Sequence, residues 1–126
     1  MRDLLLIGAY ALGAGAVVGL AGAGALRLLR DGDLTADTGR RIAELGGRRL
    51  ALTVREFDLL EFLLRHPAQA YSRAQLLDQV WGWQFGDQST VTVHVRRLRE
   101  KVEPDPSAPA RLVTVWGIGY RWEDES

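Results

Sequence analysis

A cluster of basic residues near the C-terminal end is the part of this sequence best suited to binding chemistry. Arg96, Arg97, Arg99 and Lys101 all lie in the run QSTVTVHVRRLREKV, residues 88–102. Guanidinium and ammonium groups bind anions such as phosphate, and arginine also pairs in a bidentate manner with planar acceptors. Taken alone, such a cluster is more often a basic surface that contacts only water. The elements that position it decide between these interpretations.

The spacing of apolar residues predicts that residues 88–102 form a helix. The alternation of valine and threonine over 90–95 would also suit a strand. The longer pattern favours the helix, because four residues recur at i, i+4, i+7 and i+11 and share one face: Val91, Val95, Leu98 and Val102. The opposite side carries Ser89, Val93, Arg96, Arg97 and Glu100, with Thr90 and His94 on one flank. An exposed valine beside two arginines calls for an explanation.

Two shorter helices are predicted before this one. Thr53 and Glu56 form a capping-box pattern ahead of apolar residues, so a helix is expected over about 54–65. It should end before Pro67, because the residue before a proline disfavours helical geometry. A second capping box opens the segment SRAQLLDQVWG, which predicts a helix that ends at the final glycine of that segment.

Hairpins are predicted on both sides of these helices. Gly46 and Gly47 separate the runs IAEL and RRLAL, which is a hairpin signal. We expect four residues on one face of this small antiparallel sheet: Leu34, Ile42, Leu50 and Leu52. Residues 111–122, RLVTVWGIGYRW, contain two β-rich runs around a glycine-containing turn and predict a C-terminal hairpin. The predicted order is therefore sheet, three helices and hairpin.

Length and composition limit the class of protein. The chain has 126 residues, with 16 basic and 16 acidic side chains and no cysteine. This length permits one domain with a short additional segment. The lack of cysteine excludes a disulfide framework, a thiolate zinc site and a cysteine nucleophile. Residues 31–126 hold 13 basic and 15 acidic side chains, a formal charge of −2, so the overall charge indicates no particular partner.

The first 30 residues form an apolar leader that differs from the domain expected at 31–126. Residues 4–26 are uncharged and long enough for a transmembrane helix across a hydrocarbon core of about 30 Å. More arginines follow this segment than precede it, which would place the domain in the cytoplasm, tethered to the inner membrane. A cleaved signal peptide and a remnant of another globular domain stay open as alternatives. Small residues that would share one helix face, and so favour helix dimerisation, are Ala11, Gly15, Gly19 and Ala23.

Residues 33–122 resemble the C-terminal effector domain of OmpR/PhoB-type response regulators. The matching strings are LTVREFDLLEFLLRHP, SRAQLLDQVWG, STVTVHVRRLREKV and RLVTVWGIGYRW, in the order and spacing of that family. The resemblance implies an α+β winged helix-turn-helix with an N-terminal antiparallel sheet, three helices and a C-terminal β-hairpin wing. It also implies a bacterial transcription regulator that binds double-stranded DNA, with helix 88–102 in the major groove and a homodimer on DNA.

Within this resemblance each candidate residue has an expected role. An arginine can bind guanine O6 and N7, and a valine can touch a thymine methyl, so the base-contact candidates are Thr90, Val93 and Arg97. The phosphate-contact candidates are His94, Arg96, Arg99, Lys101 and the wing residue Arg121. The wing turn contains Trp116, Gly117 and Gly119. The loop before the recognition helix contacts RNA polymerase in this family, so Trp83 and Phe85 are candidates for that contact, although a place in the core is an equal alternative.

The sequence also departs from the family pattern. The family's Arg-Thr-Val-Asp start of the recognition helix reads Ser-Thr-Val-Thr here, from Ser89 to Thr92. Trp116 stands where the wing commonly has an arginine. Two cationic contacts are missing, which predicts weaker binding or an altered sequence preference. The leader is too short for a receiver domain, so regulation by aspartyl phosphorylation of this chain is not expected.

Other chemistries find little support in the sequence. Asp37-Thr38-Gly39 matches an aspartic-protease tripeptide but is better explained as a turn. The acidic residues around it lack the glycine of a calcium loop, and the two histidines without cysteine predict no metal site. Gly117 and Gly119 lack the strand-to-helix context of a phosphate loop. We therefore expect no enzyme activity and no cofactor. The alternative function is a degenerate winged helix that acts in protein interaction or as a membrane scaffold.

Overall fold

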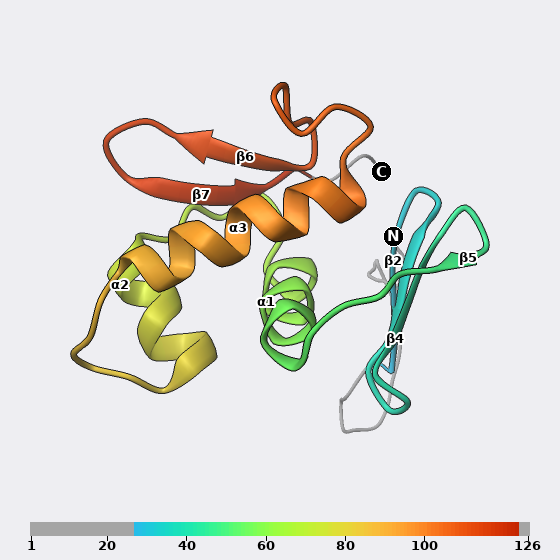
Figure 1. Ribbon diagram of the computed structural model, residues 1–126, viewed down its shortest axis with the longest axis horizontal. Coiled ribbons are helices and arrows are strands. Elements are labelled where there is room, and N and C mark those ends of the chain that lie inside the picture. Colours follow the sequence, from blue (N-terminus) through green and yellow to red (C-terminus); the bar gives the residue numbers. More distant parts are fainter. Residues whose placement is uncertain (1–26, 124–126) are drawn as a thin grey trace.

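The computed structural model describes residues 27–123, which begin with a four-stranded antiparallel sheet. Its strands follow the chain in the order β2-β3-β4-β5 and lie at one end of the molecule (Figure 1). Their bounds are β2 Leu28–Asp31, β3 Leu34–Asp37, β4 Ile42–Leu45 and β5 Arg48–Arg49. Strand β2 starts at Leu28, within the 30 residues that the sequence assigns to the leader.

The inner face of this sheet differs from the expected one at Ile42. Leu34 pairs with Leu45 and Ala36 pairs with Ala43, and all four contribute to the core or pack against it. Side chains alternate along a strand, so the burial of Ala43 turns its neighbour Ile42 to the other face. The prediction for Ile42 is therefore wrong. Leu34 lies on the core side of the sheet as predicted, whereas Leu50 and Leu52 pack against the core from the segment after β5, outside the strands.

The first predicted helix is confirmed as α1, Val54–Arg65. The Thr53 side chain accepts a hydrogen bond from Glu56 N–H, and the Glu56 side chain accepts one from Thr53 N–H. This reciprocal capping box satisfies two donors that a helix start otherwise leaves free. The helix ends at His66, before Pro67, as predicted.

The second predicted helix is divided into two parts. A capping box between Ser72 and Gln75 starts α2, Arg73–Leu76, which continues directly into the π-helical turn η1, Leu77–Trp81. Gly82 ends this turn in the left-handed conformation at φ 75°. Apolar spacing located the helix and its end but gave no sign of the wider turn, in which both the first and the last residue are buried.

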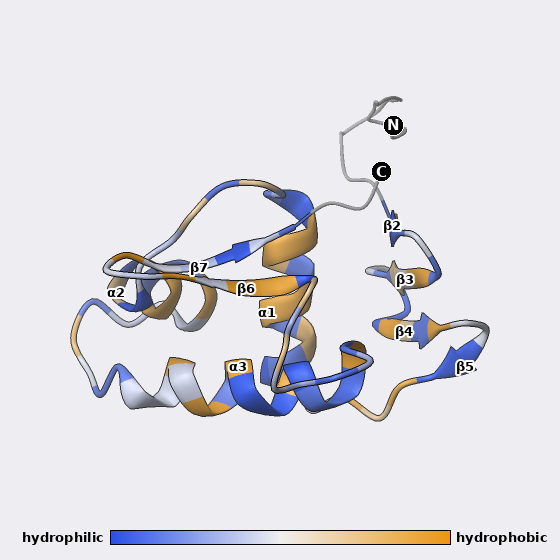
Figure 2. Cartoon of the chain, turned by 90° about the horizontal axis from the view of Figure 1, so that it is seen from above, coloured by the Kyte–Doolittle hydropathy of each residue, from blue (hydrophilic) through white to orange (hydrophobic). Residues whose placement is uncertain are grey.

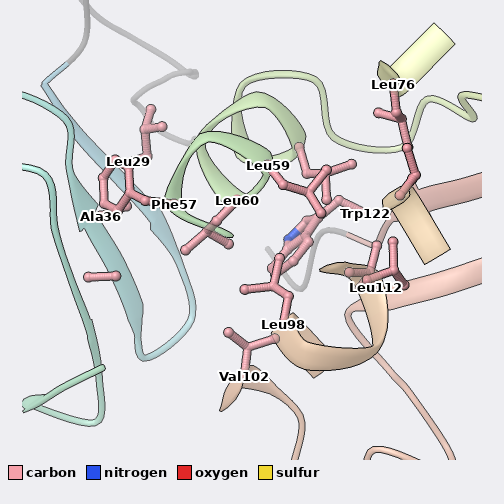
Figure 3. Close-up of a cluster of buried hydrophobic side chains, with 14 of the residues drawn as sticks. Leu29, Ala36, Phe57, Leu59, Leu60, Leu76, Leu98, Val102, Leu112 and Trp122 are labelled. Atoms are coloured by element: carbon pink, nitrogen blue, oxygen red, sulfur yellow. The ribbon is translucent and has the colours of Figure 1, made fainter. Parts of the chain in front are cut away.

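The core lies between α1, α3 and the C-terminal hairpin. Helix α3 spans Ser89–Val102, and its predicted apolar face is fully buried: Val91, Val95, Leu98 and Val102. Figure 3 shows Leu60 of α1, Leu98 of α3 and Trp122 of the hairpin converging in this core. Burying an aliphatic side chain of this size stabilises the fold by about 1.5–3 kcal/mol. The buried face therefore fixes which side of α3 points outward.

The C-terminal hairpin consists of β6, Leu112–Val115, and β7, Gly119–Trp122. Tyr71, just before α2, extends it: Tyr71 N–H donates to the Tyr120 carbonyl at 2.8 Å, and Tyr120 N–H donates back to the Tyr71 carbonyl at 2.9 Å. This approach is so close that a Cβ on Gly119 would lie 2.0 Å from the Tyr71 carbonyl oxygen. Only glycine fits there.

Polar contacts secure the base of the hairpin. The Trp122 indole N–H donates to the buried Asp31 carboxylate at 2.7 Å. The Glu103 carboxylate accepts hydrogen bonds from three successive backbone N–H groups, at Ala110, Arg111 and Leu112. Donors removed from water cost stability unless they find an acceptor, so Glu103 stabilises the entry into β6.

Two further predictions concern the turn at Asp37-Thr38-Gly39 and the apolar run 4–26. Asp37 Oδ1 accepts hydrogen bonds from Gly39 N–H and Arg40 N–H, so Asp37-Thr38-Gly39 is a turn, as expected. The apolar run 4–26, with its proposed span and dimer face, lies outside the described residues. Within residues 27–123 no helix has the length and apolar character needed to cross a membrane.

Candidate nucleic-acid interface

The outward face of α3 carries two arginines with free side chains. Arg96 and Arg97 are exposed, and within residues 27–123 neither guanidinium has a hydrogen-bond or ion-pair partner. Val93 lies between them on the same face and is half-buried. Figure 2 shows α3 along one side of the molecule, with hydrophilic residues over much of its length. The arrangement can present cations and a methyl surface to a partner at once.

The two threonines at the start of α3 differ in their surroundings. Thr90 is half-buried, and its carbonyl accepts a hydrogen bond from the His94 ring at 2.7 Å. Thr92 is exposed, and its hydroxyl accepts one from the Arg73 guanidinium at 3.3 Å. Arg73 is the first residue of α2 and is itself exposed. It adds a cation beside α3 that the sequence alone did not single out, because nothing in the local pattern shows that α2 starts next to Thr92.

His94 is held from two sides. Its Nδ1 must carry the proton in the bond to Thr90, because a carbonyl oxygen only accepts. The ring also meets Trp81 edge to face, with 4.9 Å between the ring centroids. A neutral His94 therefore has only Nε2 left, as an acceptor, and it can donate to a phosphate from Nε2 only as imidazolium.

Arg99 holds the hairpin to α3. Its Nε donates to the Leu112 carbonyl at 2.8 Å and its Nη2 donates to the Thr114 hydroxyl at 2.9 Å. The guanidinium also lies over the Tyr120 ring, 5.6 Å from the centroid. Burial lowers the pKa of Arg99, although an arginine stays charged in proteins. Since its donors serve the hairpin, we leave Arg99 out of the proposed phosphate contacts.

Lys101 is likewise used within the protein. Its Nζ donates to Glu56 Oε1 at 2.5 Å and to the Ala51 carbonyl at 2.7 Å. Burial raises the pKa of Glu56, but the hydrogen bonds from Lys101 and from Thr53 N–H outweigh this and keep that pKa below its ordinary value. This ion pair joins α3 to the start of α1. Because its ammonium group is used there, Lys101 is not among the phosphate contacts proposed below.

Arg121 lies on the hairpin face that points away from Arg99. It pairs across the hairpin with Val113, whereas Thr114 pairs with Tyr120 on the face toward α3. Its Nε donates to Glu123 Oε1 at 2.5 Å, and both side chains are well exposed. A surface ion pair of this kind is weak. Contact between Arg121 and a DNA phosphate therefore stays a prediction, and the Glu123 carboxylate would compete with the phosphate for Arg121.

The turn of the hairpin has an apolar tip. Ile118 N–H donates to the Val115 carbonyl at 2.9 Å, and Gly117 supplies the positive φ of 81° that this tight turn requires. Trp116 is 89% exposed and Ile118 is 57% exposed. The tip thus presents an indole ring and an aliphatic side chain to solvent.

The loop between η1 and α3 also exposes aromatic side chains. Phe85 is 89% exposed and Trp83 is 46% exposed, which rules out the alternative that both belong to the core. Trp83 packs beside Gly86, where an added Cβ would lie 3.4 Å from its ring. The loop therefore exposes two aromatic side chains to solvent.

Comparison with known proteins identifies the family. The family described as "Transcriptional regulatory protein, C terminal" matches residues 47–122. The sensory transduction protein RegX3 of Mycobacterium leprae is 45% identical over 97 residues, which are 76% of this chain and 49% of RegX3. The chain thus spans about half the length of that relative.

Solved structures agree with this match. The RstA DNA-binding domain of Klebsiella pneumoniae, solved in complex with the RstA box, has a TM-score of 0.71 and 34% identity; the match covers 78% of this chain and 98% of that domain. The Thermotoga maritima response regulator DrrB, an OmpR/PhoB homologue, has a TM-score of 0.71 and 31% identity, over 77% of this chain and 44% of DrrB. This family is one of DNA-binding regulatory domains rather than enzymes. The chain therefore belongs to the family of C-terminal DNA-binding domains of OmpR/PhoB-type transcriptional regulators.

Proposed function

We propose that this chain is a transcription regulator that binds double-stranded DNA sequence-specifically, with α3 in the major groove and the β6-β7 hairpin as the wing. The observation that carries this proposal is the unpaired, exposed state of Arg96 and Arg97 opposite a fully buried face. The burial fixes the orientation of α3, so these cations point outward in the folded protein. A helix of this length fits the major groove of B-DNA.

The proposed contacts fall into two groups. Arg97, Val93 and Thr90 would read base edges, because arginine binds guanine O6 and N7 and methyl groups contact the thymine methyl. Arg96, Arg73 and Arg121 would contact phosphates, together with His94 in its imidazolium form. Phosphate contacts position the protein on the duplex, and base contacts give the sequence preference.

The test is selection of the full purified chain on random duplex DNA at moderate salt, followed by sequencing. We expect enrichment of one motif by the wild type and loss of preference at one position in Arg97→Ala. Arg48→Ala is the matched control, because it removes the same charge from exposed strand β5 at the other end of the molecule. Equal enrichment of all sequences by the wild type would reject specific DNA binding and support a degenerate interaction module, the alternative that the exposed Trp83 and Phe85 favour.

We also propose a tandem arrangement on DNA. Two copies would occupy a direct repeat, with half-sites separated by about one helical turn, 10 to 10.5 bp. Inserting five base pairs between the half-sites places the second copy on the opposite side of the duplex. We expect this insertion to abolish cooperative binding in a mobility-shift titration, and unchanged cooperativity would reject the arrangement.

The exposed loop aromatics support RNA polymerase as a second partner. Trp83 and Phe85 are solvent-accessible on the loop that leads into α3, so a bound polymerase could contact them while α3 is on DNA. The double change Trp83→Ala and Phe85→Ala should reduce transcription from a target promoter in vitro and leave DNA affinity unchanged. Full transcription by this variant would reject the contact.

The apolar run 4–26 supports a membrane tether as a further proposal. Alkaline extraction of membranes from cells that produce the full chain tests it. Retention in the membrane pellet is expected. Recovery in the soluble fraction would leave the signal peptide and the remnant of another domain as explanations, which the mass of the recovered chain distinguishes.

A further inference from the structure

We infer that the wing tip is an apolar wedge: Trp116, supported by Ile118, inserts between base pairs from the minor groove and kinks the bound DNA. This inference rests on the proposed function, because it concerns how the same interface engages the duplex. It assigns to the tip a chemistry different from that of a cationic wing.

The tip offers mainly apolar surface and no charge, with the Trp116 indole N–H as its one side-chain donor. The turn sequence Val115-Trp116-Gly117-Ile118-Gly119 holds no charged side chain. Arg99, which reaches Thr114 two residues before Trp116, is engaged within the protein because it donates to β6. A phosphate would find no counter-charge at this tip, whereas the flat, weakly polar faces of bases match an exposed indole.

The tip is also anchored to the rest of the domain. Gly119 lies against the Tyr71 backbone, and two hydrogen bonds between Tyr71 and Tyr120 fix β7 beside the start of α2. The turn itself is closed by the bond from Ile118 N–H to the Val115 carbonyl. Inserting a side chain into stacked bases costs energy at the base step, and little further ordering of this hairpin is needed to deliver it.

Continuity with α3 indicates that DNA covers the tip. Arg99 links α3 to Thr114, only two residues before Trp116, which is about 7 Å along a strand. In Figures 1 and 2 the turn between β6 and β7 lies at the end of the molecule that also holds the N-terminus of α3. Two of the proposed base contacts, Thr90 and Val93, lie in this N-terminal half of α3. A duplex bound there would run past the tip, and an apolar side chain reads its minor groove by wedging into a base step.

The wedge has a consequence for sequence preference. Pyrimidine–purine steps such as TA and CA/TG unstack and kink most easily. Sites selected by the wild type should therefore contain such a step on the wing side of the major-groove motif. The expected kink is about 20–90° toward the major groove.

The test compares full-length wild type with Trp116→Ala on the selected site. DNA bending is measured by the electrophoretic mobility of the complexes, and base unstacking by 2-aminopurine placed at the base step on the wing side of the motif. The wild type should bend the DNA and change the probe fluorescence, because the indole replaces a base as the stacking neighbour of the probe. Trp116→Ala should lose both signals and bind about 5- to 150-fold more weakly. Ile118→Ala should show a smaller loss of the same kind. Trp83→Ala is the matched control, since it removes an exposed indole from the neighbouring loop and should leave bending intact.

The outcomes separate the two proposals. Equal bending and equal probe fluorescence for wild type and Trp116→Ala would overturn the wedge while specific binding stands. A wild type that selects no motif would overturn both proposals. If Trp116→Ala loses bending and Arg97→Ala loses sequence preference, the results support both the wedge and specific DNA binding. Because Trp116 is on the surface, the thermal unfolding curve of Trp116→Ala should match that of the wild type and so exclude misfolding.

Discussion

The Arg99 guanidinium donates a hydrogen bond to the Thr114 hydroxyl at 2.9 Å, so a cation within the basic cluster of α3 fixes the position of the hairpin. Arg99 also donates a hydrogen bond to the carbonyl of Leu112, two residues before Thr114 on the same strand. The spacing between recognition helix and wing is thereby set inside the protein. Arg96 and Arg97, by contrast, have no hydrogen-bond or ion-pair partner within residues 27–123, so their donors are free for an external partner.

The different contacts of Arg96 and Arg99 predict that substituting them changes the salt dependence of DNA binding differently. Arg96→Met should weaken DNA binding and reduce the slope of log affinity against log salt by about 1, because one phosphate contact is lost. Arg99→Met should destabilise the fold by about 1–2 kcal/mol through its lost hydrogen bonds and leave the slope unchanged. Salt titrations of both variants, with urea unfolding, check this. An equal change of slope in both would contradict the internal role of Arg99.

Arg97 should govern base preference. Arg97→Ala should cost about 1–3 kcal/mol on the selected site and much less on unrelated DNA. Arg97→Lys should keep the charge but lose bidentate geometry, and so recover nonspecific binding without full specificity. Competition titrations with matched and single-mismatch duplexes measure both effects. A uniform loss on all sequences would make Arg97 a phosphate contact instead.

The Glu56–Lys101 pair should make stability depend on acid pH. Folding lowers the pKa of Glu56 from its ordinary value of 4.5. Its ionised form therefore stabilises the fold above that value, and the contribution disappears as pH falls through the lower pKa of the folded state. Urea unfolding from pH 7 to pH 3 should show a smaller loss for Glu56→Gln than for the wild type. Parallel losses would mean that Glu56 contributes nothing to acid sensitivity.

Gly119 should tolerate no side chain. Gly119→Ala would place a methyl group 2.0 Å from the Tyr71 carbonyl oxygen, next to the backbone hydrogen bonds that join Tyr71 to Tyr120 of β7. We expect a loss of about 3 kcal/mol in unfolding free energy. The control is Gly39→Ala, where the nearest atoms are 3.4 Å away on the flexible Arg27 side chain. A melting temperature that falls equally in both variants would contradict this explanation.

Local signals predicted most of the fold. The capping box of Thr53 and Glu56 located α1, and the spacing of the buried valines located α3. These features act over a few residues, where sequence pattern and geometry are directly linked. Ile42 was misplaced because strand register, and not local hydrophobicity, decides which side chain turns inward.

The site was less predictable because its cations are sorted by distant partners. Arg99 finds Thr114 at 15 residues' separation, and Lys101 finds Glu56 at 45. In sequence these two cations look the same as Arg96 and Arg97. Only the fold shows which of them are committed to carbonyls and carboxylates elsewhere, and which point outward.

The bond between Asp31 and Trp122 also bears on how the domain matures. These residues are 91 positions apart, and they join the first described strand to the last. A nascent chain on the ribosome therefore lacks this closure until its final strand has been synthesised, and contacts so distant along a chain form slowly. Each helix is held by hydrogen bonds between residues close in sequence, so α1, α2 and α3 can each form before β7 is synthesised. This bond can therefore join the four-stranded sheet to the β6-β7 hairpin only after β7 has been translated.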